Sequence, residues 1–78
     1  NGDIKPLIKK YKLLSQKNPT NLDYILRVAQ FSEIIKDIDT AISYYEKYYN
    51  LKPLPKIAHS LAKLYLIKKD PYKAFSYY

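Results

Sequence analysis

The segment AISYYEKYYNLKP, residues 41–53, contains a pattern that recurs twice in the chain. The upstream copy has Leu7, Tyr11, Leu14 and Pro19 in place of Ala41, Tyr45, Tyr48 and Pro53, at a constant offset along the sequence. The downstream copy has Ala74, Phe75 and Tyr78 in place of Ala41, Ile42 and Tyr45, again at a constant offset. A fixed period of roughly 34 residues is typical of stacked repeats, in which each unit buries its apolar face against its neighbours.

Length and composition favour one small folded domain. The chain has 78 residues, of which 47% are hydrophobic and 27% charged, and it contains one glycine and no cysteine. These values exclude disulfide and thiol chemistry and nearly exclude glycine-rich phosphate loops. No window approaches the roughly 18 consecutive apolar residues of a membrane span. The chain starts with Asn1-Gly2 rather than Met, so we interpret it as a piece of a longer protein.

The charge is strongly basic. Fourteen Lys or Arg residues oppose seven acidic ones, which gives a formal net charge of +7. This balance favours acidic partners of any kind, including acidic peptides, nucleic acid and anionic lipid. The lysines are mostly dispersed, with short runs only at 9–12 and 68–69. A solvated lysine-rich surface is therefore the simpler interpretation.

Apolar residues spaced three and four apart predict helices over 4–17, 22–35, 39–51, 56–68 and from 71 to the last residue. The start signals are Asp3, then Thr20 or Asn21, then an aspartate in 36–39, then Asp70 followed by Pro71. No strict alternation indicates a strand. Because the connections are short, consecutive helices are expected to be antiparallel.

The helical stripes also predict which side chains face inward. They are Ile4, Leu7, Ile8, Tyr11 and Leu14; Leu22, Ile25, Val28, Ala29, Ser32 and Ile35; Ala41, Ile42, Tyr45, Tyr48, Tyr49 and Leu51; and Ala58, Leu61, Ala62 and Tyr65. Ten tyrosines interleaved with lysines are also compatible with base stacking in a nucleic-acid binder. Most of them fall on core positions, which leaves four partly exposed: Tyr24, Tyr44, Tyr72 and Tyr77.

The alanine pair Ala29 and Ala41 has the same separation in the sequence as the pair Ala62 and Ala74, and an aromatic follows the second alanine of each pair one helical turn later. This pattern resembles the tetratricopeptide repeat. The resemblance implies an all-α fold of antiparallel helix-turn-helix units stacked into a right-handed superhelix. It divides the single domain 1–78 into helix B of a partial repeat at 4–17, a complete repeat at 22–53, and helix A with a truncated helix B at 55–78. The departures include Ser32 where the family usually has Tyr, and Lys-Asp at the turns where it favours Gly-Asp.

The resemblance further implies a non-catalytic scaffold that binds a peptide or helix of another protein in a concave groove lined by the A helices. The groove positions in the first A helix are Asp23, Leu26, Arg27, Gln30 and Glu33. Those in the second are Lys56, His59, Ser60, Lys63 and Leu66. Because Lys56 and Lys63 flank His59, one hypothesis is a pocket for a carboxylate or acidic side chain. The alternative is an ordinary solvated helix face.

The residue inventory argues against catalysis and against metals or other cofactors. There is one histidine, and the adjacent Ser60 points to a different face of its helix. Two other functions remain open. One is a basic module that binds nucleic acid or an anionic surface. The other is a structural role, with self-association through repeat ends that lack a polar cap.

Overall fold

The computed structural model describes residues 4–77, and every regular element in that range is a helix. The helices are α1 (Lys5–Lys17), α2 (Leu22–Ile34), α3 (Ile38–Leu51), α4 (Pro55–Ile67) and α5 (Pro71–Phe75). All five predicted helices are present, and the first four begin and end within one residue of the predicted bounds. The prediction for the last helix was wrong at its end. It stops at Phe75, because the last turn tightens and the amide of Tyr77 bonds to the carbonyl of Ala74.

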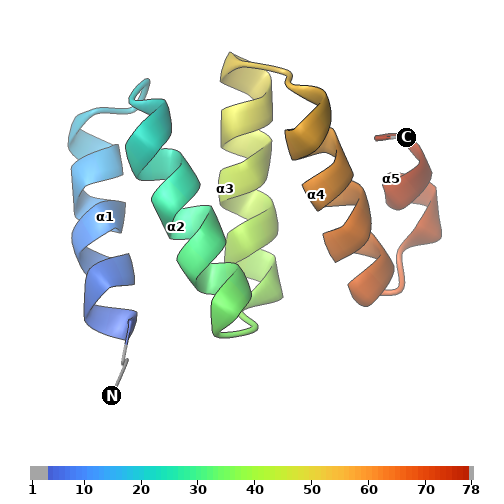
Figure 1. Ribbon diagram of the computed structural model, residues 1–78, viewed down its shortest axis with the longest axis horizontal. Coiled ribbons are helices and arrows are strands. Elements are labelled where there is room, and N and C mark those ends of the chain that lie inside the picture. Colours follow the sequence, from blue (N-terminus) through green and yellow to red (C-terminus); the bar gives the residue numbers. More distant parts are fainter. Residues whose placement is uncertain (1–3, 78) are drawn as a thin grey trace.

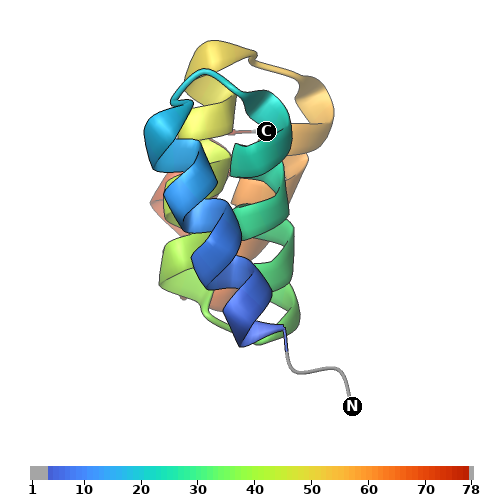
Figure 2. The ribbon, with the colours of Figure 1, turned by 90° about the vertical axis from the view of Figure 1, so that its left-hand side faces the viewer.

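The helices lie side by side in chain order (Figure 1). Among residues 4–77, each helix packs against the next one along the chain, and no two helices that skip a neighbour come into backbone contact. The Cα atoms fill a slab of 32 × 28 × 15 Å. Seen from its edge, α2 and α4 lie toward one side and α3 toward the other (Figure 2). The α2–α4 side is therefore a face built from alternate helices.

Four alanines are fully buried in the two pairs of packed helices. Ala29 and Ala41 belong to the α2–α3 pair, and Ala62 and Ala74 to the α4–α5 pair, and each has 0% exposed surface. A side chain of one methyl group lets two helix backbones pack tightly, and any larger group would force them apart. The repeated alanine spacing thus coincides with two buried helix crossings.

The α2–α3 turn combines a helix end and a helix start in very few residues. Lys36 has a positive φ of 65°, the left-handed conformation usually taken by glycine. The amide of Lys36 donates to the carbonyl of Glu33 at 3.1 Å, and that of Asp37 donates to the carbonyl of Ser32 at 2.8 Å. The Asp37 carboxylate then accepts a hydrogen bond from the amide of Thr40 and caps α3. Asp37 therefore closes one helix and opens the next.

The α4–α5 turn repeats this geometry at the equivalent positions of the next hairpin. Lys69 has a φ of 63°, and its amide donates to the carbonyl of Leu66 at 3.0 Å. The amide of Asp70 donates to the carbonyl of Tyr65 at 2.8 Å, and the Asp70 side chain accepts from the amide of Lys73. Lysine at the position where the family resemblance favours glycine therefore carries a conformational cost of about 1 kcal/mol at each turn.

Three burial predictions were wrong. Leu7 and Leu51 are 41% and 47% exposed, because Leu7 lies on the side of α1 away from α2 and Leu51 is the last residue of α3. Tyr44 is only 8% exposed, because α3 packs against both α2 and α4 and buries a wider arc than one stripe. The predicted cap Asp3 and the predicted core residue Tyr78 lie outside the described residues.

A polar cluster joins the second pair of helices to the first. Glu46 of α3 accepts hydrogen bonds from the hydroxyls of Tyr65 in α4 and Tyr77 after α5. The ring of Tyr77 stacks on Tyr65 with centroids 6.0 Å apart and meets Tyr49 of α3 edge-on at 5.4 Å. These contacts hold the last segment of the described chain against α3. No helix within residues 4–77 has the length and apolar character needed to cross a membrane.

Candidate partner-binding face

A pocket of about 110 Å³ lies between α2 and α4, on the face that these helices share. Its lining residues come from three helices: Leu26 and Gln30 of α2, Tyr45 of α3, and Lys56, Ile57 and Ser60 of α4. Four of the six, Leu26, Gln30, Lys56 and Ser60, are predicted groove residues. The structure therefore brings two residues of each predicted set to one pocket.

Glu33 connects the three helices beside this pocket. Its Oε1 accepts a hydrogen bond of 3.0 Å from the hydroxyl of Tyr45 in α3. Its Oε2 lies 3.4 Å from Nζ of Lys63 in α4. The ion pair is partly solvent-exposed, so it contributes at most about 1 kcal/mol to stability. The ion pair matters more for ligand binding, because it partly neutralises Lys63, which the sequence analysis placed in a pocket for an acidic ligand.

The hydroxyl of Tyr45 is tuned by the same contacts. Burial of the ring, followed by the hydrogen bond and negative charge of Glu33, raises the pKa of Tyr45 well above its usual value. The raised pKa keeps the hydroxyl of Tyr45 protonated, and able to donate to Glu33, to a higher pH than that of an exposed tyrosine. This hydrogen-bonded side chain forms one wall of the pocket.

Four other predicted groove residues lie outside this pocket. Asp23, Arg27, His59 and Leu66 are exposed, and none of them is among the pocket's lining residues. They extend the α2–α4 face around the pocket. The residues that the structure describes contain no group of three or more His, Cys, Asp or Glu side chains that could hold a metal ion.

A second and wider hollow of about 570 Å³ adjoins the first near the end of α2. The two share Gln30 and Tyr45, and the second also contacts Phe31 and Ile34. Ile34 is 66% exposed. The α2–α4 face therefore continues toward the α2–α3 turn as a partly apolar surface.

Sequence reasoning missed two lining residues. Tyr45 was assigned to the core, and it is buried, yet its hydroxyl end reaches the pocket beside Glu33. Ile57 is buried next to Lys56 and was not assigned to either set. Glu33 and Tyr45 have the same separation in the sequence as the two alanines at the helix crossing, which was a usable signal for their contact.

We compared the chain with protein-family models, curated protein sequences and solved structures. None of the family models, curated proteins or solved structures matches it.

Proposed function

We propose that the α2–α4 face binds an extended segment or a helix of another protein and performs no chemical step. The observation that carries this proposal is the pocket to which both A helices contribute, lined by Leu26, Gln30, Lys56 and Ser60. In this proposal the chain is part of a tetratricopeptide-like array, and the right-handed superhelical stacking is part of the same hypothesis. The α2–α4 side would be the concave surface of that array.

The lining residues indicate what the ligand segment contributes. Leu26 and Ile57 offer apolar surface, and the volume of about 110 Å³ accommodates one small side chain. Lys56 is exposed and forms no ion pair with the described residues, whereas Lys63 is already paired with Glu33. An acidic group on the ligand is therefore expected at Lys56 and His59 rather than at Lys63.

The Glu33 contacts support a preformed site. The side chain of Glu33 is fixed from two directions, by Tyr45 of α3 and by Lys63 of α4. A surface whose side chains are already ordered loses less conformational entropy when a ligand binds. This arrangement suits a scaffold that presents a rigid groove.

The proposal is tested by selecting ligands without prior assumptions. A displayed library of random peptides is panned against the 78-residue chain, and selected peptides are measured by fluorescence anisotropy. Ser60→Arg fills the pocket with a bulky side chain. Ser43→Arg, an identical change at an exposed site on α3, is the matched control.

We expect Ser60→Arg to weaken binding about tenfold or more, since one filled pocket removes on the order of 1.4 kcal/mol. Ser43→Arg should change the affinity by less than about twofold. Equal losses in the two variants, or selected peptides that bind both variants as well as the parent chain, would place the binding surface elsewhere and refute the proposal. Circular dichroism spectra of both variants establish that they remain folded.

A further inference from the structure

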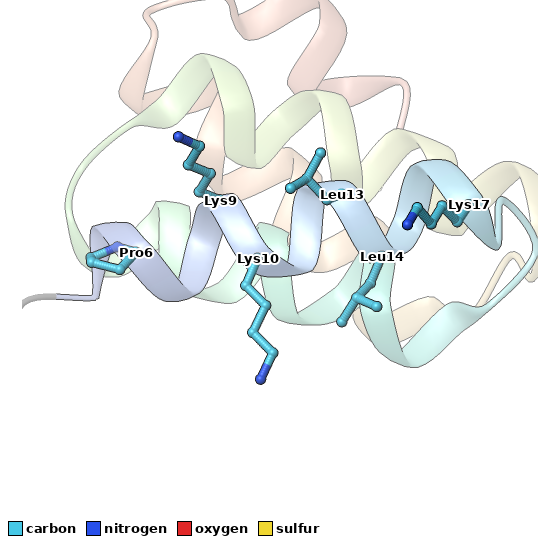
Figure 3. A pocket seen from close by; sticks show the side chains of 6 residues that line it. All are labelled: Pro6, Lys9, Lys10, Leu13, Leu14 and Lys17. Carbon is cyan, nitrogen blue, oxygen red and sulfur yellow. The ribbon is translucent and has the colours of Figure 1, made fainter.

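Helix α1 carries a separate hollow, distinct from the two on the α2–α4 face, on the side that faces away from α2. It measures about 420 Å³ and is lined by Pro6, Lys9, Lys10, Leu13, Leu14 and Lys17. These positions are spaced three and four apart, so they form a single stripe of the helix. Figure 3 shows Lys9 and Leu13 on one side of this stripe, and Lys10 and Leu14 on the other. Each side of the stripe thus carries one lysine and one leucine, so cationic and apolar side chains are interspersed along it.

This hollow is separate from the face that α1 uses to pack. Ile8 and Ser15 are buried, and Tyr11 contacts the rings of Tyr24 and Phe31 in α2. No described helix other than α2 contacts α1. The hollow is therefore left open by the fold of residues 4–77.

The charge on α1 is one-sided. The helix reads KPLIKKYKLLSQK, which contains five lysines and no acidic residue. It therefore holds five of the fourteen basic residues of the chain and none of the seven acidic ones. Lys9, Lys10 and Lys17 form no ion pair with any described residue. Unpaired cations interspersed with apolar side chains attract a ligand that carries both apolar groups and negative charge.

Comparison with α3 shows that this stripe does not follow the pattern of a buried helix face. Lys10 occupies the repeat position that Tyr44 occupies in α3, and Lys17 occupies that of Leu51, which is itself 47% exposed. Tyr44 is buried in the packed structure, whereas its equivalent Lys10 is charged and exposed. Burying three unpaired ammonium groups under an apolar helix would be strongly unfavourable. A covering element must therefore bring carboxylates to the lysines.

We propose that the α1 stripe docks an acidic amphipathic helix of another protein. Leucine-like side chains of that helix would insert between Leu13, Leu14 and Pro6, and its carboxylates would pair with Lys9, Lys10 and Lys17. A second copy of this chain does not supply such a surface. Glu33 and Glu46 are half-buried and hydrogen-bonded, Asp39 pairs with Lys68, and Asp37 and Asp70 cap helices. Among residues 4–77 this leaves Asp23 as the one exposed carboxylate without such a contact, and one carboxylate does not match three lysines.

The geometry favours a peptide over nucleic acid or a membrane. Single-stranded nucleic acid is bound through stacking on aromatic rings, and no aromatic residue lines the hollow. A helix lying on a bilayer inserts a broad apolar face. Here the stripe has only three apolar residues interspersed with three lysines, and its hollow is suited to inserted side chains.

The test uses a synthetic helical peptide with leucines spaced three and four apart and glutamates on either side. A peptide of the same composition with scrambled order is the control probe. The 78-residue chain labelled with ¹⁵N is titrated with each peptide and followed by NMR. We expect the ordered peptide to shift the amides of α1 at Lys10, Leu13, Leu14 and Lys17, and to bind about tenfold tighter than the scrambled one.

Two pairs of variants separate apolar from electrostatic recognition. Leu13→Ser should weaken binding about tenfold, whereas Leu51→Ser, at a similarly exposed leucine of α3, should not change it. Lys10→Glu with Lys17→Glu should abolish binding, whereas Lys47→Glu with Lys52→Glu makes the same change in net charge on and beside α3 and should leave most of it. Amide correlation spectra of each variant verify its fold.

Several results would overturn this proposal. Equal binding of the ordered and scrambled peptides would show attraction by net charge alone. Shifts confined to α2 and α4 would assign the peptide to the α2–α4 face, which would support the proposed function and remove this one. Tight binding to anionic phospholipid vesicles or to a single-stranded oligonucleotide, lost in the Lys10→Glu, Lys17→Glu variant, together with no binding of the ordered peptide, would assign the stripe to those ligands.

Discussion

The α2–α3 and α4–α5 hairpins share a backbone frame but differ in where their polar side chains connect. In the first hairpin, Glu33 of α2 accepts a hydrogen bond from Tyr45 of α3 within the hairpin and also pairs with Lys63 of α4 in the second. The equivalent of Glu33 in the second hairpin is Leu66, which is 48% exposed and makes no such bond. Instead, Tyr65 reaches back to Glu46 in the first hairpin. The buried alanines are thus the same in both hairpins, whereas the polar contacts that join the hairpins involve residues that differ between the repeats.

The same difference appears at one repeat position inside the core. Ser32 in α2 occupies the repeat position that Tyr65 occupies in α4. The hydroxyl of Tyr65 bonds to Glu46, whereas the buried hydroxyl of Ser32 has no hydrogen-bond partner within residues 4–77. The first hairpin therefore accepts a small unpaired polar group where the second places an aromatic ring.

The largest expected effect tests the two alanine crossings. Ala41→Leu should destabilise the chain by about 3 kcal/mol, because α3 is held between α2 and α4 and cannot move outward. Ala74→Leu should cost about 1 kcal/mol, because the five-residue α5 packs on a single helix and can shift. Urea unfolding followed by circular dichroism measures both.

The exposed Ser43→Leu on α3 is the control for the alanine pair, and it should change the unfolding free energy by less than about 0.5 kcal/mol. Equal losses at Ala41 and Ala74 would mean that both crossings are equally constrained, contrary to the packing described above.

Alkaline pH should weaken both hairpins through their buried tyrosines. Burial and the neighbouring glutamates raise the pKa values of Tyr45 and Tyr65 above the usual 10.0. Above that pH the unfolded chain loses these protons while the folded chain keeps them, so the free energy of unfolding falls as pH rises. The slope is at most about 1.4 kcal/mol per pH unit for each tyrosine. Urea unfolding between about pH 9 and about pH 11 measures it.

Phenylalanine variants measure how much the Tyr45–Glu33 and Tyr65–Glu46 contacts each contribute to the fall of the unfolding free energy at alkaline pH. Tyr45→Phe removes the share that belongs to the contact within the first hairpin, and Tyr65→Phe removes the share that belongs to the contact between hairpins. Tyr72→Phe, at a ring that is 87% exposed, should leave the slope unchanged. A slope as steep in the double variant as in the parent chain would contradict this interpretation, because Tyr77 and Lys68, whose pKa values are also raised, account only for a remainder.

Removing the aspartate cap of each hairpin should lower the free energy of unfolding by different amounts in the two hairpins, and this difference is smaller than that between the alanine variants. Asp37→Ala is expected to cost about 1 kcal/mol, because α3 loses the side chain that bonds its first turn. Asp70→Ala is expected to cost about half as much, because only the short α5 depends on it. Thermal unfolding compares the two.

Asparagine at either cap position keeps the hydrogen-bond acceptor, so Asp37→Asn and Asp70→Asn should retain most of the stability. A loss in the Asn variants as large as in the Ala variants would point to the charge rather than to the hydrogen bond.

The smallest effect concerns the two left-handed lysines, where the hairpins should respond alike. Lys36→Gly and Lys69→Gly relieve a positive φ and are each expected to stabilise the chain by about 0.5 kcal/mol, after the greater chain entropy of glycine is subtracted. Differential scanning calorimetry resolves such changes as shifts of the melting temperature. Lys52→Gly, where φ is −149°, should not stabilise.

Local signals in the sequence predicted the helices well and their surroundings less well. The cap at Asp70 was predicted correctly, and the caps at Asn21 and Asp37 were each one of two predicted alternatives, because a start signal acts within a few residues of chain. Leu51 and Tyr44 were assigned to the wrong environment because exposure depends on which helices flank α3. That arrangement is a tertiary property, which the helical period alone does not encode.

The candidate site shows the same division. The spacing of Leu26 and Gln30, and of Lys56 and Ser60, placed each pair on one helix face, and the structure brings the two pairs to one pocket. The link from Glu33 to Lys63 was not predicted, because it depends on the distance between α2 and α4. That contact changes the charge available to a ligand.

In the α2–α3 and α4–α5 turns, Asp37 and Asp70 each bond to the preceding helix through the amide and cap the next helix through the side chain. This double role limits where the chain can bend. Between α2 and α3, and between α4 and α5, every backbone amide from the helix end to the next cap is engaged in a hydrogen bond, so neither turn has a torsion angle free to act as a hinge. In each of these turns three amides donate to carbonyls of the preceding helix, whereas in the connection at 52–54 only the amide of Lys52 does so. Pro53 has no amide proton to donate, and the amide of Leu54 bonds within the connection, to the carbonyl of Lys52. We therefore expect the chain to bend between hairpins, which would widen or narrow the α2–α4 face while leaving each hairpin intact.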